Sequence, residues 1–206
     1  MKKKEINEQL KDKYVLLCVD PSLACTGYSV LEVSDNGPEI LNGKFVRLLD
    51  YGTIPTNHLK VGDSLMYFEK VMSTVIDKYK PDYVASEQMF AGKNRNTGMK
   101  LAYIHGIMQL LCAKNHLSVV YYSVMTAKSK TLDGIKAKHE DGTKKTGDEM
   151  KKEVAEKVIS ILGKESFFKE YNLDVTDSIS MGITFIKMEG KEIEKVKKKR
   201  KKKGIK

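Results

Sequence analysis

The chain has 206 residues, a formal net charge of +10 and three cysteines, Cys18, Cys25 and Cys112. This length suits a single domain that folds without disulfides, and the cysteines, which form no C-x-x-C pair, argue against a cysteine-ligated metal and indicate a reducing compartment. No apolar run approaches the roughly 18 residues of a membrane span, so we expect a soluble intracellular protein.

The positive charge is concentrated at the two ends of the chain. Residues 1–13 carry five lysines and three acids, and residues 187–206 carry eleven basic and three acidic residues, whereas residues 14–186 contain 21 of each. We therefore expect a basic N-terminal extension over 1–13, a folded domain over 14–187 and a disordered Lys-rich tail over 188–206. Such a tail binds any polyanion weakly, so it is compatible with nucleic acid, with a localisation signal and with solubility alone.

Hydrophobic periodicity and turn residues predict the elements of the domain. In chain order, we expect strands at 14–20, at 27–33 and within 44–54, a helix at 57–79, a strand at 82–86, a helix at 97–114, a strand at 117–124, a helix at 148–162 and a closing helix that begins near residue 174. This order predicts an α/β domain with a five-stranded mixed sheet, whose antiparallel strands are followed by parallel ones, and with helices on both faces. Residues 135–147 are polar and predict a surface loop.

The helix expected at 97–114 has two apolar stripes, one of Leu101, Ile104, Met108 and Leu111 and the other of Tyr103, Ile107 and Leu110. A helix that covers apolar surface on two sides lies deep in the core or is shared with a partner subunit. The stripes alone leave both possibilities open, and in a homodimer this helix would be the candidate interface. His105, on the same helix, is expected to be a packed side chain and not a catalyst.

Four acids lie where predicted elements begin or end. Asp20 ends the first strand, Glu87 follows the fourth, and Asp174 and Asp177 open the last helix. Each has a structural explanation by itself, since Asp174 suits a helix N-cap and Asp177 a first turn. Together they would form a cluster that needs cations, and oxygen ligands without Cys or His suit Mg²⁺ or Mn²⁺. Two such ions are suited to cleavage of a phosphodiester.

Several stretches resemble motifs of the RuvC-type Holliday junction resolvases. They are "DPSLACTGYSVL", "PDYVASEQMFAGKN", "MKLAYIHGIMQLL" and "DVTDSISMGIT", which occur in the order and spacing of the family across about 14–134 and 147–187. The resemblance implies an RNase H-like fold, a homodimer, and cutting of four-way DNA junctions by paired symmetric nicks. It also implies two Mg²⁺ ions in each active site, for which Mn²⁺ would substitute.

The resemblance also assigns roles to individual residues. Asp20, Glu87, Asp174 and Asp177 fall on the catalytic acids of the family, with Asp20 expected to bridge two metals. Lys151 falls on a family lysine near the scissile phosphate, where it would stabilise developing negative charge. The alternative for Lys151 is a solvated lysine on the surface of a helix.

A second group of residues is expected to contact DNA. Phe90 matches an aromatic residue that stacks on bases at the centre of the junction, although a core position is the alternative. The family has a further lysine before "TLDG", and a one-residue offset leaves both Lys128 and Lys130 as candidates. The full set of expected DNA-binding residues is Phe90, Lys93, Arg95, Lys100, Lys128, Lys130, Lys144 and Lys145.

The sequence also departs from the family pattern. Ser22 stands where a glycine is common, and residues 135–147 lengthen a segment expected to face DNA. We therefore expect a divergent member, with phage origin as one explanation, in the cytoplasm of a bacterial or phage-infected cell. No helicase partner can be identified.

Three other functions compete with resolution of junctions. A nuclease of the same fold would act on flaps, forks or RNA hybrids, and substrate preference would distinguish it. A non-catalytic protein that binds branched DNA would not need all four acids. Sugar kinases and actin-like ATPases share the strand order, but they need a second glycine-rich phosphate loop and a second domain.

Overall fold

The computed structural model describes residues 13–22, 24–89, 95–133, 139, 141, 143–167 and 172–202. Its elements are β1 (Lys13–Asp20), β2 (Cys25–Ser34), β3 (Phe45–Pro55), α2 (Val61–Tyr79), β4 (Tyr83–Glu87), α3 (Arg95–Lys114), β5 (Ser118–Tyr122), α4 (Val124–Leu132), α5 (Gly147–Leu162), a 3-10 turn (Lys164–Ser166) and α6 (Leu173–Lys202). In this part of the chain, no helix has the length and apolar character needed to cross a membrane.

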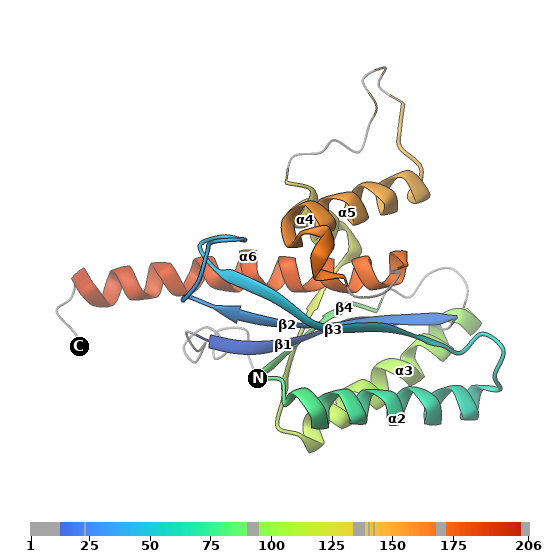
Figure 1. The fold of residues 1–206 in the computed structure, drawn as a ribbon. Helices are drawn as coiled ribbons and strands as arrows, with labels where there is room; N and C mark the ends of the chain where they lie inside the picture. The colour runs from blue at the N-terminus through green and yellow to red at the C-terminus, as the bar shows by residue number, and fades with distance from the viewer. Residues whose placement is uncertain are drawn as a thin grey trace.

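The five strands form one mixed sheet in the order β3-β2-β1-β4-β5. β2 pairs antiparallel with both β1 and β3, whereas β4 pairs parallel with both β1 and β5. Helices α2 and α3 cover one face of the sheet, and α4, α5 and α6 lie over the other (Figure 1). The predicted fold class, a five-stranded mixed sheet between helices, is confirmed.

The alternation of side chains along β1 divides the core into two layers. Leu16 and Cys18 belong to the cluster under α6, while Leu17 and Val19 belong to the cluster under α2 and α3. Because successive side chains of a strand point to opposite faces, Asp20 shares the α6 face with Leu16 and Cys18. The same period applies to β4, where Tyr83 and Ala85 pack under α6 and Glu87 follows two residues later.

Helix α4 was not predicted, because its first residues continue the apolar run of β5. β5 ends at Tyr122, and the Ser123 side chain caps the new helix by accepting a hydrogen bond from the Thr126 backbone N–H at 3.2 Å. A capping serine satisfies a backbone donor that the first turn leaves without a partner, so a helix can start here. The strand predicted over 117–124 is therefore two residues too long at its end.

The start of α6 also differs in one detail from the prediction. The helix is capped by Asn172, whose side-chain oxygen accepts a hydrogen bond from the Val175 backbone N–H at 3.0 Å. Asp174 is therefore not the N-cap residue but lies in the first turn, where the helix dipole favours an acid.

The tail that was predicted to be disordered from residue 188 is helical up to Lys202. Two contacts explain why the helix continues past residue 187. Met188 packs on the core, and Glu189, which is 1% exposed, accepts a hydrogen bond from the Tyr122 hydroxyl at 3.1 Å. Lysine is a good helix former, and its charge is favourable near the C-terminus of a helix. Residues 1–12, within the predicted N-terminal extension, lie outside the described residues.

Candidate active site

Asp20 and Glu87 lie side by side at one edge of the sheet. They are the last residues of the parallel neighbours β1 and β4, and the pairing of Val19 with Ser86 places them next in register. The pleat directs both side chains toward α6. Asp20 is only 8% exposed, and its carboxyl group interacts directly with that of Glu87.

The first turn of α6 lies directly on β2, next to Asp20. Gly27 pairs with Asp20 across β1 and β2, and a Cβ atom on Gly27 would lie 2.0 Å from the backbone oxygen of Asp174. Any side chain at Gly27 would therefore displace the start of α6. A glycine inside a strand often marks such a close approach, and this signal was present in "DPSLACTGYSVL", although Gly27 was not predicted to matter.

Two further contacts of small residues continue along the same helix and strand. A hydrogen bond of 3.0 Å joins the Ser178 and Ser29 hydroxyls, and a Cβ on Gly182 would lie 2.6 Å from Leu31 Cδ1. The contacting residues are four apart along α6, a rise of about 6 Å, and two apart along β2, a rise of about 6.8 Å. Because these two spacings are similar, successive contact residues of the helix meet successive contact residues of the strand. This row of contacts holds α6 in one register on β2, and that register places Asp174 and Asp177 near Asp20.

The acids of the site crowd one another. Burial raises the pKa of the Asp20 carboxyl well above its usual range, the Glu87 and Asp177 carboxyls raise it further, and Lys151 opposes the change. Burial also raises the pKa of Asp177, against the opposing effect of the ammonium groups of Lys151 and Lys128. The cluster therefore has more negative charge than the surrounding protein compensates.

Lys151 provides the nearest positive charge. Its Nζ lies 3.0 Å from Asp177 Oδ2 and 3.9 Å from Asp174 Oδ1. Burial lowers the pKa of Lys151, but the attraction of Asp177, Asp20 and Asp174 outweighs burial and raises it, so the group stays an ammonium ion. The structure thus places Lys151 against the acids, with its side chain partly exposed.

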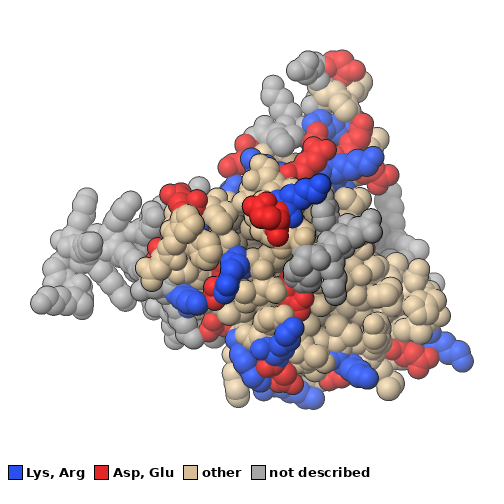
Figure 2. Space-filling view, viewed as in Figure 1, with Lys and Arg blue, Asp and Glu red and all other residues tan. Residues whose placement is uncertain are grey.

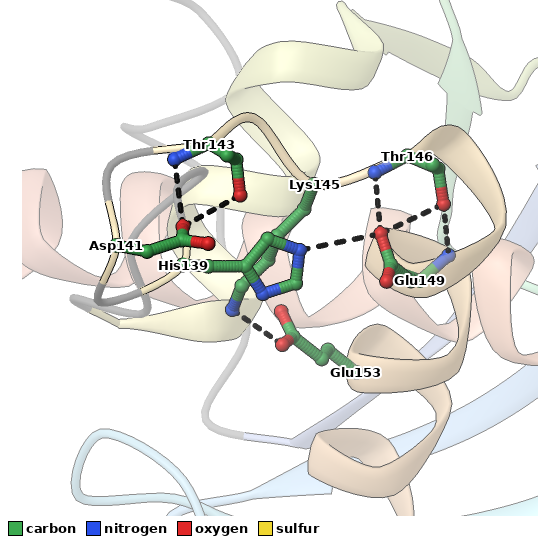
Figure 3. Close-up of polar contacts among 7 residues, drawn as sticks. All are labelled: His139, Asp141, Thr143, Lys145, Thr146, Glu149 and Glu153. Atoms are coloured by element: carbon green, nitrogen blue, oxygen red, sulfur yellow. Dashed lines mark hydrogen bonds and ion pairs between the residues drawn. The ribbon is translucent and has the colours of Figure 1, made fainter.

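The start of α5 determines where Lys151 is held. The Thr146 side chain accepts a hydrogen bond from the Glu149 backbone N–H at 3.2 Å, and Glu149 Oε2 accepts one from the Thr146 backbone N–H at 2.6 Å (Figure 3). This reciprocal capping box defines the first turn of α5. Lys151 follows one turn later and reaches α6 from there.

Lys128 and Lys130, the two lysines of α4 that were expected to contact DNA, have different surroundings. Lys128 acts on the Asp177 carboxyl, whereas the Lys130 backbone oxygen accepts a hydrogen bond from Lys187 Nζ at 2.8 Å. Of the two, Lys128 is the lysine whose charge affects an acid of the site.

A divalent cation fits the donors of this site by their chemistry. The four carboxylates offer oxygen donors, which suits Mg²⁺ or Mn²⁺, and the one thiol beside them, Cys25, interacts with Asp174. In the part of the chain that the structure describes, no three acidic, histidine or cysteine side chains already surround one point. Binding of an ion would therefore require the carboxylates to turn toward a common centre.

The remaining predicted DNA-binding residues are dispersed. Phe90, Lys93 and the Arg95 side chain lie outside the described residues, and Lys100 and Lys144 are exposed. Lys145 is largely buried in an ion pair with Glu153 (Figure 3). Basic and acidic side chains are interspersed over the face seen in Figure 2, so on this face charge alone does not outline a DNA-binding surface.

The described part of the expected loop 135–147 packs near the start of α5. His139 Nε2 lies 3.6 Å from Glu149 Oε2, and Asp141 accepts a hydrogen bond from the Thr143 backbone N–H at 2.9 Å (Figure 3). The first contact connects the loop to the helix that carries Lys151, and the second lies within the loop.

Comparison with known sequences gives a consistent result. The family model described as "Crossover junction endodeoxyribonuclease RuvC" matches residues 16–185. A relative of that name from Caldicellulosiruptor saccharolyticus is 34% identical over 114 residues, which cover 55% of this chain and 64% of the relative. One from Clostridioides difficile is 30% identical over 115 residues, covering 55% of this chain and 63% of the relative. The matches thus span slightly less than two thirds of these relatives.

Comparison with solved structures supports the fold. The structure titled "T. thermophilus RuvC in complex with Holliday junction substrate" matches with a TM-score of 0.65 at 19% identity, covering 84% of this chain and 96% of the other. The yeast mitochondrial Holliday junction resolvase matches with a TM-score of 0.57 at 12% identity, covering 92% and 85%. The predicted RNase H-like fold is that of these neighbours. Since the family model spans most of the chain, including all four acids, this protein belongs to the RuvC family.

Proposed function

We propose that this protein is a metal-dependent endonuclease that resolves four-way DNA junctions by paired symmetric nicks. The observation that carries the proposal is the convergence of Asp20, Glu87, Asp174 and Asp177 from β1, β4 and α6, with Lys151 in contact. Four acids from three separate elements meet at one edge of the sheet. Placing these acids together costs electrostatic free energy, and cations bound between them and a phosphate would offset that cost.

The residues that would hold two Mg²⁺ ions, for which Mn²⁺ would substitute, are Asp20, Glu87, Asp174 and Asp177. When bound, such ions activate a water molecule and stabilise charge on the phosphate. The chain itself supplies the burial that excludes competing water from Asp20 and keeps the acids in place. Lys151 would offset negative charge on the phosphate, and Lys128 would assist beside it.

A homodimer through α3 would match the two-fold symmetry of a junction. Ile104, Met108 and Leu111 are buried against the domain, but Tyr103 and Leu110 remain 45% and 53% exposed. Tyr103 and Leu110 of the second stripe thus remain at the surface, where a second copy of the chain would cover them, while Ile107 packs partly against the core. Two sites related by one axis would then cut two strands of the junction symmetrically.

The Lys-rich end of α6 would add affinity for DNA without adding selectivity. The residues after Glu189 contain ten basic and two acidic residues. Such a segment attracts phosphate groups of any sequence and raises the salt dependence of binding.

The test compares cleavage of a mobile four-way junction, a flap, an RNA hybrid and a linear duplex by the wild type and Glu87→Gln, with Mg²⁺ or with EDTA. Glutamine keeps the size of the side chain and removes its charge. We expect paired, ligatable nicks in the junction, reduced by about a thousandfold in the variant and absent in EDTA, while binding persists. Better cleavage of flaps or hybrids would instead favour a nuclease of the same fold with another substrate.

A further inference from the structure

Three large apolar side chains are exposed at the edge of the sheet where the acids lie. Met89, just after β4, is 41% exposed, and Val124 and Met125, in the first turn of α4, are 38% and 74% exposed. The Gln88 backbone N–H donates a hydrogen bond of 2.7 Å to the Tyr122 carbonyl oxygen and so joins the two segments. We call Met89, Val124 and Met125 the apolar rim.

The apolar rim borders the candidate active site. Met125 lies three residues before Lys128 on α4, so the two side chains are neighbours on the helix surface. Lys128 acts on the Asp177 carboxyl, and Met89 follows Glu87 by two residues. A DNA strand with a phosphate at the acids would therefore bring an adjacent nucleotide over the rim.

The packing of α4 does not account for these exposed side chains. Ala127, Thr131 and Leu132 are the residues that α4 buries against the domain. Met125 lies outside that buried face, and its apolar surface is left in water. Exposed apolar side chains on two segments that are hydrogen-bonded to each other beside a site are candidates for a surface that a ligand covers.

The chemistry of the rim favours an unstacked base over an intact duplex. In a duplex the apolar faces of the bases are hidden by stacking, whereas a nucleotide at a branch point can expose them. A thioether makes favourable contacts with aromatic rings, and methionine adapts its shape to an irregular surface. Lys128, one turn away, supplies a cation for the phosphate of the same nucleotide.

We propose that the apolar rim, with Met125 at its most exposed point, contacts the unstacked nucleotide next to the cleaved phosphate. The inference rests on the proposed function, because it requires a DNA strand at the acids. It adds a contact from α4 and from the end of β4 to the stacking predicted for Phe90.

The test uses Met125→Ala, Met125→Gln and Met125→Leu in the full-length protein, with Met66→Ala as the matched control. Met66 is 72% exposed but lies on α2, which covers the opposite face of the sheet. The steady-state constants are measured on a four-way junction, and 2-aminopurine beside the mapped cleavage position reports stacking. Sedimentation is measured alongside, so that a change in assembly is seen separately.

We expect Met125→Ala and Met125→Gln to raise KM about three- to tenfold and to reduce the fluorescence change, with kcat within about twofold of wild type. Met125→Leu and Met66→Ala should behave as wild type. The inference is overturned if Met125→Gln matches wild type on a junction that wild type cuts, or if Met66→Ala is impaired as much. A wild-type protein that does not cut the junction would overturn the proposed function itself.

Discussion

Asp20 is a buried carboxyl group that faces two other acids, so without a cation its ionised form is costly. Lys151 reduces this cost but contacts the two α6 aspartates, and Asp20 is left between Glu87 and the helix. In the proposed function, such an acid would exchange its proton for a metal ion. The same property makes the stability of the protein depend on pH.

We predict that Asp20→Asn stabilises the metal-free protein at neutral pH while reducing cleavage by about a thousandfold. Because the folded state raises the pKa of Asp20, it binds more protons than the unfolded state, and the free energy of unfolding falls as pH rises through that pKa. Asparagine does not ionise and avoids this loss.

Thermal melts in EDTA between pH 4 and pH 8 would test whether the stability of the wild type falls relative to that of Asp20→Asn as pH rises. The melting temperatures of wild type and Asp20→Asn should converge at about pH 4, near the ordinary pKa of aspartate, and diverge as pH rises. Addition of Mg²⁺ at neutral pH should stabilise the wild type and not the variant. A variant that melts below wild type at neutral pH in EDTA would contradict this account of Asp20.

At the scale of elements, the contact between α6 and β2 positions half of the acids. Gly27 allows the Asp174 backbone to lie against β2, the Ser29–Ser178 hydrogen bond continues the contact, and Gly182 ends it. Gly27 lies against Asp174, at the acids, whereas Gly182 lies on α6 eight residues beyond Asp174, a distance of about 12 Å along the helix. Comparing a substitution at Gly27 with one at Gly182 therefore distinguishes a loss of packing between α6 and β2 from a change in the position of the acids.

We predict that Gly27→Ala lowers cleavage about a hundredfold, because it shifts Asp174 and Asp177 relative to Asp20. Gly182→Ala is the matched control, since it overpacks the same helix at a cost of about 1–3 kcal/mol in stability. The Mg²⁺ concentration for half-maximal cleavage should rise for Gly27→Ala and stay near wild type for Gly182→Ala. Urea unfolding of both variants measures the common loss of stability. Equal loss of metal response in both would show that Gly27 has only a packing role.

At the scale of the whole molecule, α6 connects the acids at its start with the Lys-rich segment at its end (Figure 1). The distance along the helix from Asp177 to Lys202 is roughly 37 Å, at about 1.5 Å per residue. Any phosphates bound by the end of α6 would therefore be far from a phosphate held at the acids. Affinity and cleavage should be separable.

We predict that replacing the seven consecutive basic residues 197–203 by glutamine weakens junction binding about tenfold or more at 0.1 M salt. The slope of log K against log salt should become shallower by about 0.9 for each DNA phosphate that the variant no longer neutralises. Single-turnover cleavage at saturating protein should change little, and a variant with glutamine at Lys78 and Lys80 controls for removal of charge elsewhere. An unchanged salt slope would exclude this segment from DNA binding.

Much of the architecture follows from local patterns in the sequence. An apolar run that ends in an acid identifies both β1 and β4, because only buried strands need so many apolar residues and a charge is tolerated only where the strand leaves the core. The helical period identifies α2, α3 and α5 in the same way. Motifs around Asp20, Glu87 and Asp177 identify the family.

Other features are decided by contacts between residues far apart in the chain. The sequence by itself determined which acids are candidates, but whether Lys128 or Lys130 acts on an acid of the site depends on how α4 lies beside α6. Likewise, the tertiary structure decided which stripe of α3 is buried and that α6 approaches Gly27 closely enough to exclude a side chain. The physical reason is that the periodicity of a segment shows which of its faces is apolar. Which other element packs on that face depends on contacts between residues far apart in the chain.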